Sequence, residues 1–113
     1  MPTLRFRAAA LRDLAQIAEY IARESGDRGT GEALVDRLIA YCERIGALPQ
    51  EMGRSRQEVR DGYRSVTFGS YVIFFRYIDA DGPRSHLYVG NVIHGRRDLD
   101  AFFSAEDGEP DDD

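Results

Sequence analysis

At 113 residues, the chain is long enough for one hydrophobic core and too short for two ordinary domains, and a composition of 42% hydrophobic and 11% aromatic residues excludes a wholly disordered protein. The formal net charge of -5 comes from one end, because residues 106–113 hold six of the 20 acids and no base, which leaves 15 arginines and 14 acids in residues 1–105. We therefore expect one nearly neutral domain over residues 1–105 and a disordered acidic tail over residues 106–113.

The first part of the chain predicts a short strand and a helical hairpin. Thr3–Arg7 alternates apolar and charged residues, as a half-buried strand does. Over Ala8–Glu24, apolar residues recur at three- and four-residue spacing, which predicts an amphipathic helix that Gly26 closes. A second amphipathic helix follows the turn at Asp27–Gly31 and ends before Pro49. Each helix has to bury its apolar stripe against the other and against a sheet.

The second part predicts a meander of three strands. Residues 50–58 lack periodicity and indicate a loop, and strands are expected at about Val59–Phe68, Tyr71–Ile78 and Ser85–His94. The connections, Gly69-Ser70 and a longer turn over residues 79–83, are too short for anything but antiparallel neighbours. Tyr71–Ile78 is apolar on both faces, so we place it inside the sheet. A short helix is expected over Arg97–Phe103.

This order of elements, β-α-α-β-β-β-(α), predicts an α+β fold in which a helical hairpin packs on a small, mainly antiparallel sheet. Cys42, the single cysteine, lies in the pattern of the second helix and indicates a buried thiol; it excludes an internal disulfide. We expect no metal and no cofactor, since His86 and His94 alone do not make a metal site. The N-terminus has no cleavable apolar segment, and no apolar run approaches the about 18 residues of a membrane span, so we expect a cytoplasmic protein without membrane contact.

Five segments, in this order and spacing, resemble the ParE branch of the RelE/ParE toxin superfamily. They are A-L-R-D-L-A-Q-I-A-E-Y-I-A at residues 10–22, L-P-Q-E-M-G-R at 48–54, G-Y-R-S at 62–65, Y-V-I-F-F-R-Y at 71–77 and V-I-H-G-R-R-D-L at 92–99. The resemblance implies the RelE/ParE-like fold and the toxin half of a bacterial type II toxin-antitoxin or plasmid-stabilisation module. Its implied partners are a ParD-like antitoxin and DNA gyrase, which ParE-type members inhibit or poison without catalysis. No sequence-specific DNA binding by this chain is expected.

The related RelE-type toxins, which cut messenger RNA on the ribosome, provide the alternative. That chemistry needs a base, a cation for the phosphate and an acid, and the candidates are Glu58, Arg64 and His94. Against this alternative, the chain has no lysine and no terminal catalytic tyrosine. Arg64 can equally pair with Asp61, Glu58 or another acid, and His94 can simply end a strand. A third possibility is a toxin-like chain without toxicity that forms complexes.

Two sets of residues are candidates for partner contact. Target contact is expected from the polar residues of the last three strands and the segment after them: Arg64, His94, Arg96 and Arg97. Antitoxin contact is expected where apolar surface exceeds what so small a body can cover, with an arginine at its rim: Leu11, Leu14, Ile21, Phe74, Arg76, Phe102 and Phe103. The alternative for the apolar residues of this set is that they complete the chain's own core.

Overall fold

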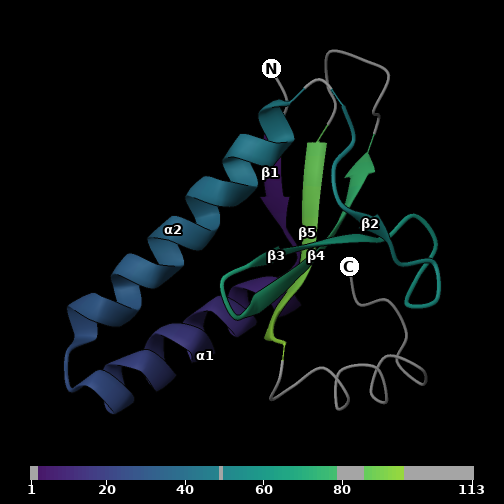
Figure 1. Ribbon diagram of the computed structural model, residues 1–113. Coiled ribbons are helices and arrows are strands. Elements are labelled where there is room, and N and C mark those ends of the chain that lie inside the picture. The colour runs from purple at the N-terminus through teal and green to yellow at the C-terminus, as the bar shows by residue number, and fades with distance from the viewer. Residues whose placement is uncertain (1–2, 49, 79–85, 96–113) are drawn as a thin grey trace.

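Two helices cover one face of a five-stranded sheet in the computed structural model, which describes residues 3–48, 50–78 and 86–95 (Figure 1). The elements in chain order are β1 (Thr3–Phe6), α1 (Ala8–Ser25), α2 (Arg28–Ala47), β2 (Arg54–Ser55), β3 (Arg64–Phe68), β4 (Tyr71–Ile78) and β5 (His86–His94). The predicted α+β class and the hairpin of helices on a mainly antiparallel sheet are confirmed. The expected helix at 97–103 lies outside the described residues.

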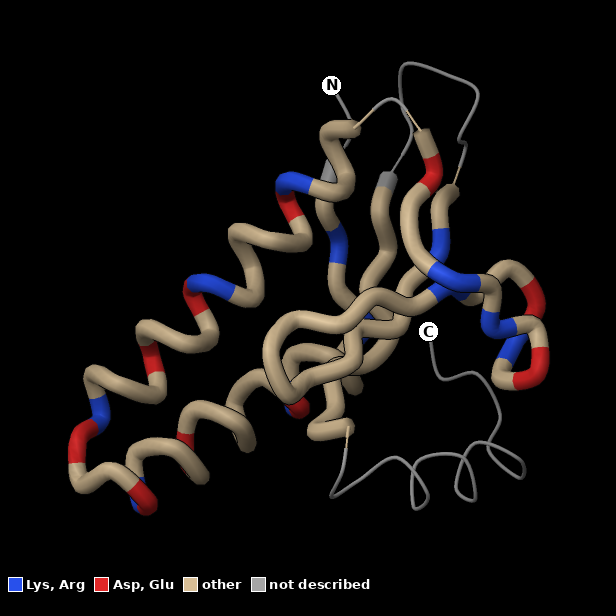
Figure 2. The backbone as a smooth tube through the Cα atoms, in the orientation of Figure 1, with Lys and Arg blue, Asp and Glu red and all other residues tan. Residues whose placement is uncertain are grey.

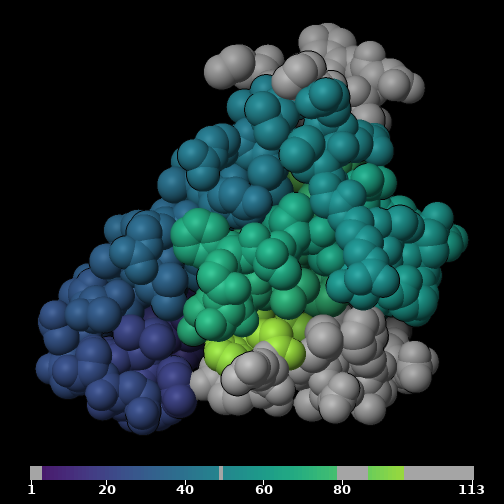
Figure 3. All heavy atoms as spheres, in the orientation of Figure 1, coloured from purple at the N-terminus to yellow at the C-terminus, as the bar shows by residue number. Residues whose placement is uncertain are grey.

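Local sequence signals fix the turn of the helical hairpin, where α1 ends and α2 begins. Gly26 closes α1 in the left-handed conformation, with φ at 72°. Asp27 caps α2, because its carboxylate accepts hydrogen bonds from Gly29 N–H at 3.0 Å and from the Thr30 hydroxyl at 2.9 Å. The helices meet at Gly31, where a methyl group would overlap the carbonyl oxygen of Ala18 and lie 3.2 Å from its Cα. In the space-filling view, the atoms of α2 lie directly against those of the β3–β4 hairpin (Figure 3).

The strands lie in the order β1-β5-β4-β3-β2, and all neighbours are antiparallel except β1 and β5. The Tyr71–Ile78 strand is thus central, as predicted, and the tight turn before it has Gly69 at a φ of 60°. The register slips between Phe74 and Phe75, where Gly90 of β5 is the extra residue. A side chain on Gly90 would overlap the hydroxyl of Tyr63, whose ring lies over this bulge.

Two predictions about residues 50–63 are wrong in detail. A two-residue strand, β2, forms inside the segment expected to be a loop and pairs with β3. The third strand begins at Arg64 instead of Val59, because the preceding residues turn: Val59 N–H donates to the Arg56 carbonyl at 2.9 Å and Tyr63 N–H to the Arg60 carbonyl at 3.0 Å.

The apolar residues divide into a larger cluster under the helices and a smaller one on the opposite face of the sheet. The larger cluster includes Leu14, Leu38, Ile73, Phe75 and Val89. The smaller cluster contains Tyr63, Val72, Phe74 and Ile93, with Val59 packed against it. Both faces of β4 are therefore buried, which explains its nearly continuous apolar sequence. Among the described residues, no helix combines the length and apolarity needed to cross a membrane.

Candidate functional site

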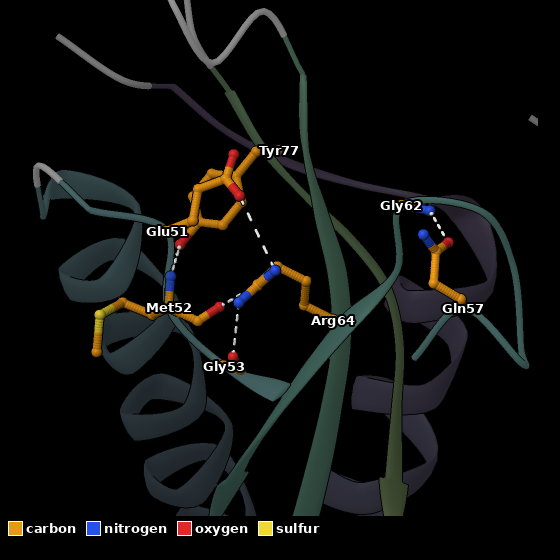
Figure 4. Close-up of polar contacts among 7 residues, drawn as sticks. All are labelled: Glu51, Met52, Gly53, Gln57, Gly62, Arg64 and Tyr77. Atoms are coloured by element: carbon orange, nitrogen blue, oxygen red, sulfur yellow. Dashed lines mark hydrogen bonds and ion pairs between the residues drawn. The ribbon is translucent and has the colours of Figure 1, made fainter. Parts of the chain in front are cut away.

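Arg64 begins β3, and its guanidinium holds the segment that leads into β2 (Figure 4). Nε donates to the Met52 carbonyl oxygen at 2.7 Å and Nη2 to the Gly53 carbonyl oxygen at 2.8 Å, while Nη1 lies 3.9 Å from Glu51 Oε1. From β4, the Tyr77 hydroxyl accepts a hydrogen bond from Met52 N–H at 2.9 Å. Arg64 is a candidate for phosphate or target contact, but a ligand would have to compete with two backbone acceptors for this guanidinium.

Gly53 lets the chain approach the sheet closely at this point. Its φ is 90°, and a methyl group there would lie 2.8 Å from the Ser65 carbonyl oxygen and 3.0 Å from the Phe75 ring. The loop between β2 and β3 is closed by a hydrogen bond, which Gln57 Oε1 accepts from Gly62 N–H at 2.9 Å (Figure 4). Two of the family-like segments, residues 48–54 and 62–65, thus meet in one structural assembly around Arg64.

Glu58, the candidate base, is exposed in the loop between β2 and β3. Its Oε2 lies 3.4 Å from Nη1 of Arg56, whose Nε donates to the Ser65 hydroxyl at 2.8 Å. A hydrogen bond from its own backbone N–H, followed by the Arg56 guanidinium, lowers the pKa of Glu58. A general base works best with a pKa near the operating pH, so this environment makes Glu58 a weak base.

His94, the candidate acid, lies at the other end of the sheet from Arg64. It pairs with Tyr71, the first residue of β4, and the two rings meet edge to face with centroids 5.4 Å apart. Arg64 instead pairs with Phe75, four residues further along the same strand. At about 3.4 Å per residue, these positions are about 14 Å apart along the strand direction. The structure therefore keeps Arg64 and His94 apart, so the candidate base, cation and acid do not converge on one point.

The antitoxin-contact candidates are divided among different surroundings. Leu14 and Phe74 are buried in the two apolar clusters of the chain itself, and Ile21 is half-buried beside the larger cluster. Leu11 is 54% exposed on α1, although the apolar spacing placed it in the buried stripe of that helix. Arg76 lies on the helix-free face, with its guanidinium carbon 5.5 Å from the centre of the Tyr88 ring. Four further candidates lie outside the described residues: Arg96, Arg97, Phe102 and Phe103.

A polar cluster that the sequence did not predict joins α1 to β5. Asp13 Oδ2 accepts hydrogen bonds from Val92 N–H at 2.9 Å and from Asn91 Nδ2 at 3.2 Å, and Asn91 Oδ1 accepts from Arg7 Nη2 at 3.4 Å. Burial raises the pKa of Asp13, against the lowering effect of these hydrogen bonds. Helical periodicity assigns Asp13 to the solvent face together with Arg12, so the sequence carried no signal for this role.

The cluster around Asp13 provides a hydrogen-bond acceptor for a backbone N–H group at an edge of the sheet. β1 pairs with β5 only as far as Val89, so later residues of β5 have no strand beside them on that edge within the described chain. A carboxylate from α1 takes the place of the missing backbone acceptor at Val92. In the described parts of the chain, no three His, Cys, Asp or Glu side chains gather closely enough to hold a metal ion.

The family whose model matches the chain is described as the ParE toxin of the type II toxin-antitoxin system parDE, and the match covers residues 4–99. Similar curated proteins include Toxin ParE1 from two strains of Mycobacterium tuberculosis, CDC 1551 / Oshkosh and H37Rv. Each is 33% identical over 69 residues, which are 61% of this chain. The chain spans 65% of the length of these relatives.

A solved structure described as a chromosomal ParDE toxin-antitoxin system from P. aeruginosa has a similar fold, with a TM-score of 0.68. The match covers 83% of this chain and 96% of that chain at 15% sequence identity. At this identity, the similarity concerns the fold alone: the helical hairpin and the sheet on which it packs.

Proposed function

This chain belongs to the ParE toxin family of type II toxin-antitoxin systems, and from that premise we propose that it inhibits or poisons DNA gyrase and is neutralised by a ParD-like antitoxin. Its place of action would be the cytoplasm, where gyrase and the antitoxin are found. The toxin acts by binding, and its effect on gyrase needs no catalytic residue of its own.

The observation that carries this proposal is the separation of the residues that a ribonuclease would need. Arg64 already donates to the carbonyl groups of Met52 and Gly53, and His94 lies about 14 Å away along the strands. Cleavage of RNA requires the base, the cation and the acid to reach one phosphodiester at hydrogen-bonding distance. This geometry favours the binding toxin over a RelE-type endoribonuclease built on these residues.

Purified gyrase, relaxed plasmid and ATP provide the test. Added toxin is expected to reduce supercoiling or to trap double-strand breaks, and the cognate antitoxin is expected to restore the reaction. Undisturbed gyrase, together with messenger RNA cleavage in a ribosome-containing extract, would reject the proposal and return Glu58, Arg64 and His94 to consideration.

For the antitoxin we propose a contact surface on α1 that includes Leu11 and Ile21. Leu11 precedes Ala18 by seven residues, about two helical turns, so it lies on the flank of α1 that meets α2 at Gly31. An amphipathic segment of the antitoxin would bury this exposed leucine. Leu14, which is buried in the cluster under the helices, supports this surface from below, whereas Phe74 lies in the cluster on the opposite face of the sheet and takes no part in it.

Two exposed leucines allow a matched test of this surface. Leu11→Ser is expected to weaken antitoxin binding, measured by calorimetry, by about tenfold or more, because a buried leucine contributes about 1.5–3 kcal/mol. Leu48 is 40% exposed at the end of α2, and Leu48→Ser serves as the control that retains binding. Equal affinities for the two variants would place the antitoxin elsewhere.

A further inference from the structure

Arginines are distributed unevenly between the two halves of the fold. Residues 8–48, which form the helical hairpin, contain seven acids and five arginines, whereas the other described residues, 3–7, 50–78 and 86–95, contain seven arginines and three acids. Figure 2 shows arginine positions along β1, β4, β2 and the loop that follows it, with acidic positions spread along both helices. The sheet side is therefore the cationic side of the described chain, although the whole chain is acidic.

Three strands align two of these arginines with a tyrosine between them. In the register of the sheet, Arg5 of β1 lies beside Tyr88 of β5, which lies beside Arg76 of β4. We call these three residues the arginine row. Arg5 is exposed and Arg76 is half-buried, with its guanidinium over the Tyr88 ring.

The arginine row lies on the face of the sheet that carries no helix. The residues before and after it on each strand, such as Phe6, Leu87 and Tyr77, pack into the cluster under the helices, so side-chain alternation turns the row the other way. Two residues from Arg76, Phe74 lies beneath the guanidinium of Arg56, with a distance of 6.0 Å from its carbon to the ring centre. Among the described residues, no carboxylate forms an ion pair with either arginine of the row.

We propose that the arginine row binds the phosphodiester backbone of a nucleic acid. Adjacent strands are about 4.8 Å apart, so Arg5 and Arg76 begin about 10 Å apart, and their long side chains can reach neighbouring phosphates. Guanidinium groups form bidentate hydrogen bonds to phosphate, and guanidinium and aromatic groups on an open sheet also stack with unpaired bases.

An acidic protein segment fits this face less well than a nucleic acid does. Protein interfaces are held by buried apolar anchors, and the apolar residues nearby are already covered: Val72 and Ile93 are each 8% exposed and Phe74 is 0% exposed. Phosphate contact needs charge and donors without such anchors and carries no sequence preference. The expectation that this chain does not read DNA sequence is compatible with it, and the proposal does not depend on gyrase being the target.

Fluorescence anisotropy tests the proposal on the full chain. The probes are a labelled single strand of about 20 nucleotides and the matching duplex, and the affinity for each is measured from about 50 to 200 mM salt. The variant Arg5→Gln/Arg76→Gln is expected to flatten the slope of log affinity against log salt by about 1.8 for the duplex or about 1.4 for the single strand. The control Arg23→Gln/Arg37→Gln removes the same charge from exposed positions on the helices and is expected to leave the slope unchanged.

The single variant Arg5→Gln serves as a second test, because this residue is exposed on β1 and its replacement should leave the fold intact. It is expected to flatten the salt slope by about half as much as the double variant. The proposal is overturned if the wild-type chain binds neither the single strand nor the duplex at low salt. It is also overturned if the two double variants change the salt slope equally. A labelled polyglutamate that binds more tightly than DNA, with the same dependence on Arg5 and Arg76, would also overturn it and would identify an acidic protein segment as the occupant.

Discussion

Gly31 offers a direct test of how closely the two helices pack. Replacement of a helical glycine by alanine ordinarily stabilises a helix by about 1 kcal/mol. At Gly31 the new methyl group would overlap the Ala18 carbonyl oxygen and lie 3.1 Å from its carbonyl carbon, and this obstacle is backbone that cannot rotate away. Overpacking of this kind costs about 1–3 kcal/mol, and the upper end applies where backbone must move.

The net expectation for Gly31→Ala is a loss of about 2 kcal/mol in unfolding free energy, which corresponds to a fall of about 8 °C in melting temperature for a domain of this size. Gly29 lies in the same helix, where the methyl group would meet only the Asp27 side chain at 3.4 Å. Gly29→Ala is the control and should melt at or slightly above the wild-type temperature. Thermal unfolding followed by circular dichroism compares them, and two variants of equal stability would refute the close approach at Gly31.

Three other predictions concern single side chains. Arg64→Gln loses the donors to Met52 and Gly53 and should reduce unfolding free energy by about 2 kcal/mol in urea titrations; an unchanged midpoint would contradict the anchoring role. The raised pKa of Asp13 means that the folded chain holds this proton more tightly than the unfolded chain, so the resulting stability is present below the ordinary pKa of 3.8 and is lost as pH rises through the raised value. The stability of wild type relative to Asp13→Asn should therefore fall over that range, and a constant difference would argue against it. Burial raises the pKa of Cys42 to about 12, so a thiol reagent at about pH 8 should label it only at the rate of unfolding; rapid labelling of the native chain would be the contrary result.

Sequence patterns predicted the helices and the central strands because their signals are local. The cap at Gly26 and the glycine turn at Gly69 need only neighbouring residues, and both are at positive φ in the structure. The parallel pairing of β1 with β5 depends on residues more than 80 positions apart, for which one sequence carries no local signal. The strand predicted to begin at Val59 begins instead at Arg64, because Gly62 and the turn before it interrupt the extended backbone. The alternation of apolar and polar residues does not reveal this interruption.

The candidate site was harder to predict because a residue type does not reveal how its hydrogen-bonding groups are used. Arg64 is suited to bind phosphate, but the β2–β3 pairing brings the Met52 and Gly53 carbonyl groups within its reach. For Asp13, its importance follows from the unequal lengths of two strands far away in the sequence, β1 with four residues and β5 with nine.

The same inequality of strands explains why Leu11 is exposed. Because β1 is too short to pair with Val92, the carboxylate of Asp13 turns toward β5 and fixes the rotation of α1 about its own axis. Residues two positions apart on a helix project about 200° apart, so the bond that turns Asp13 toward the sheet turns Leu11 away from it. An apolar residue that periodicity assigns to the core is thereby held at the surface. The proposed antitoxin contact at Leu11 thus depends on a hydrogen bond on the opposite side of the helix.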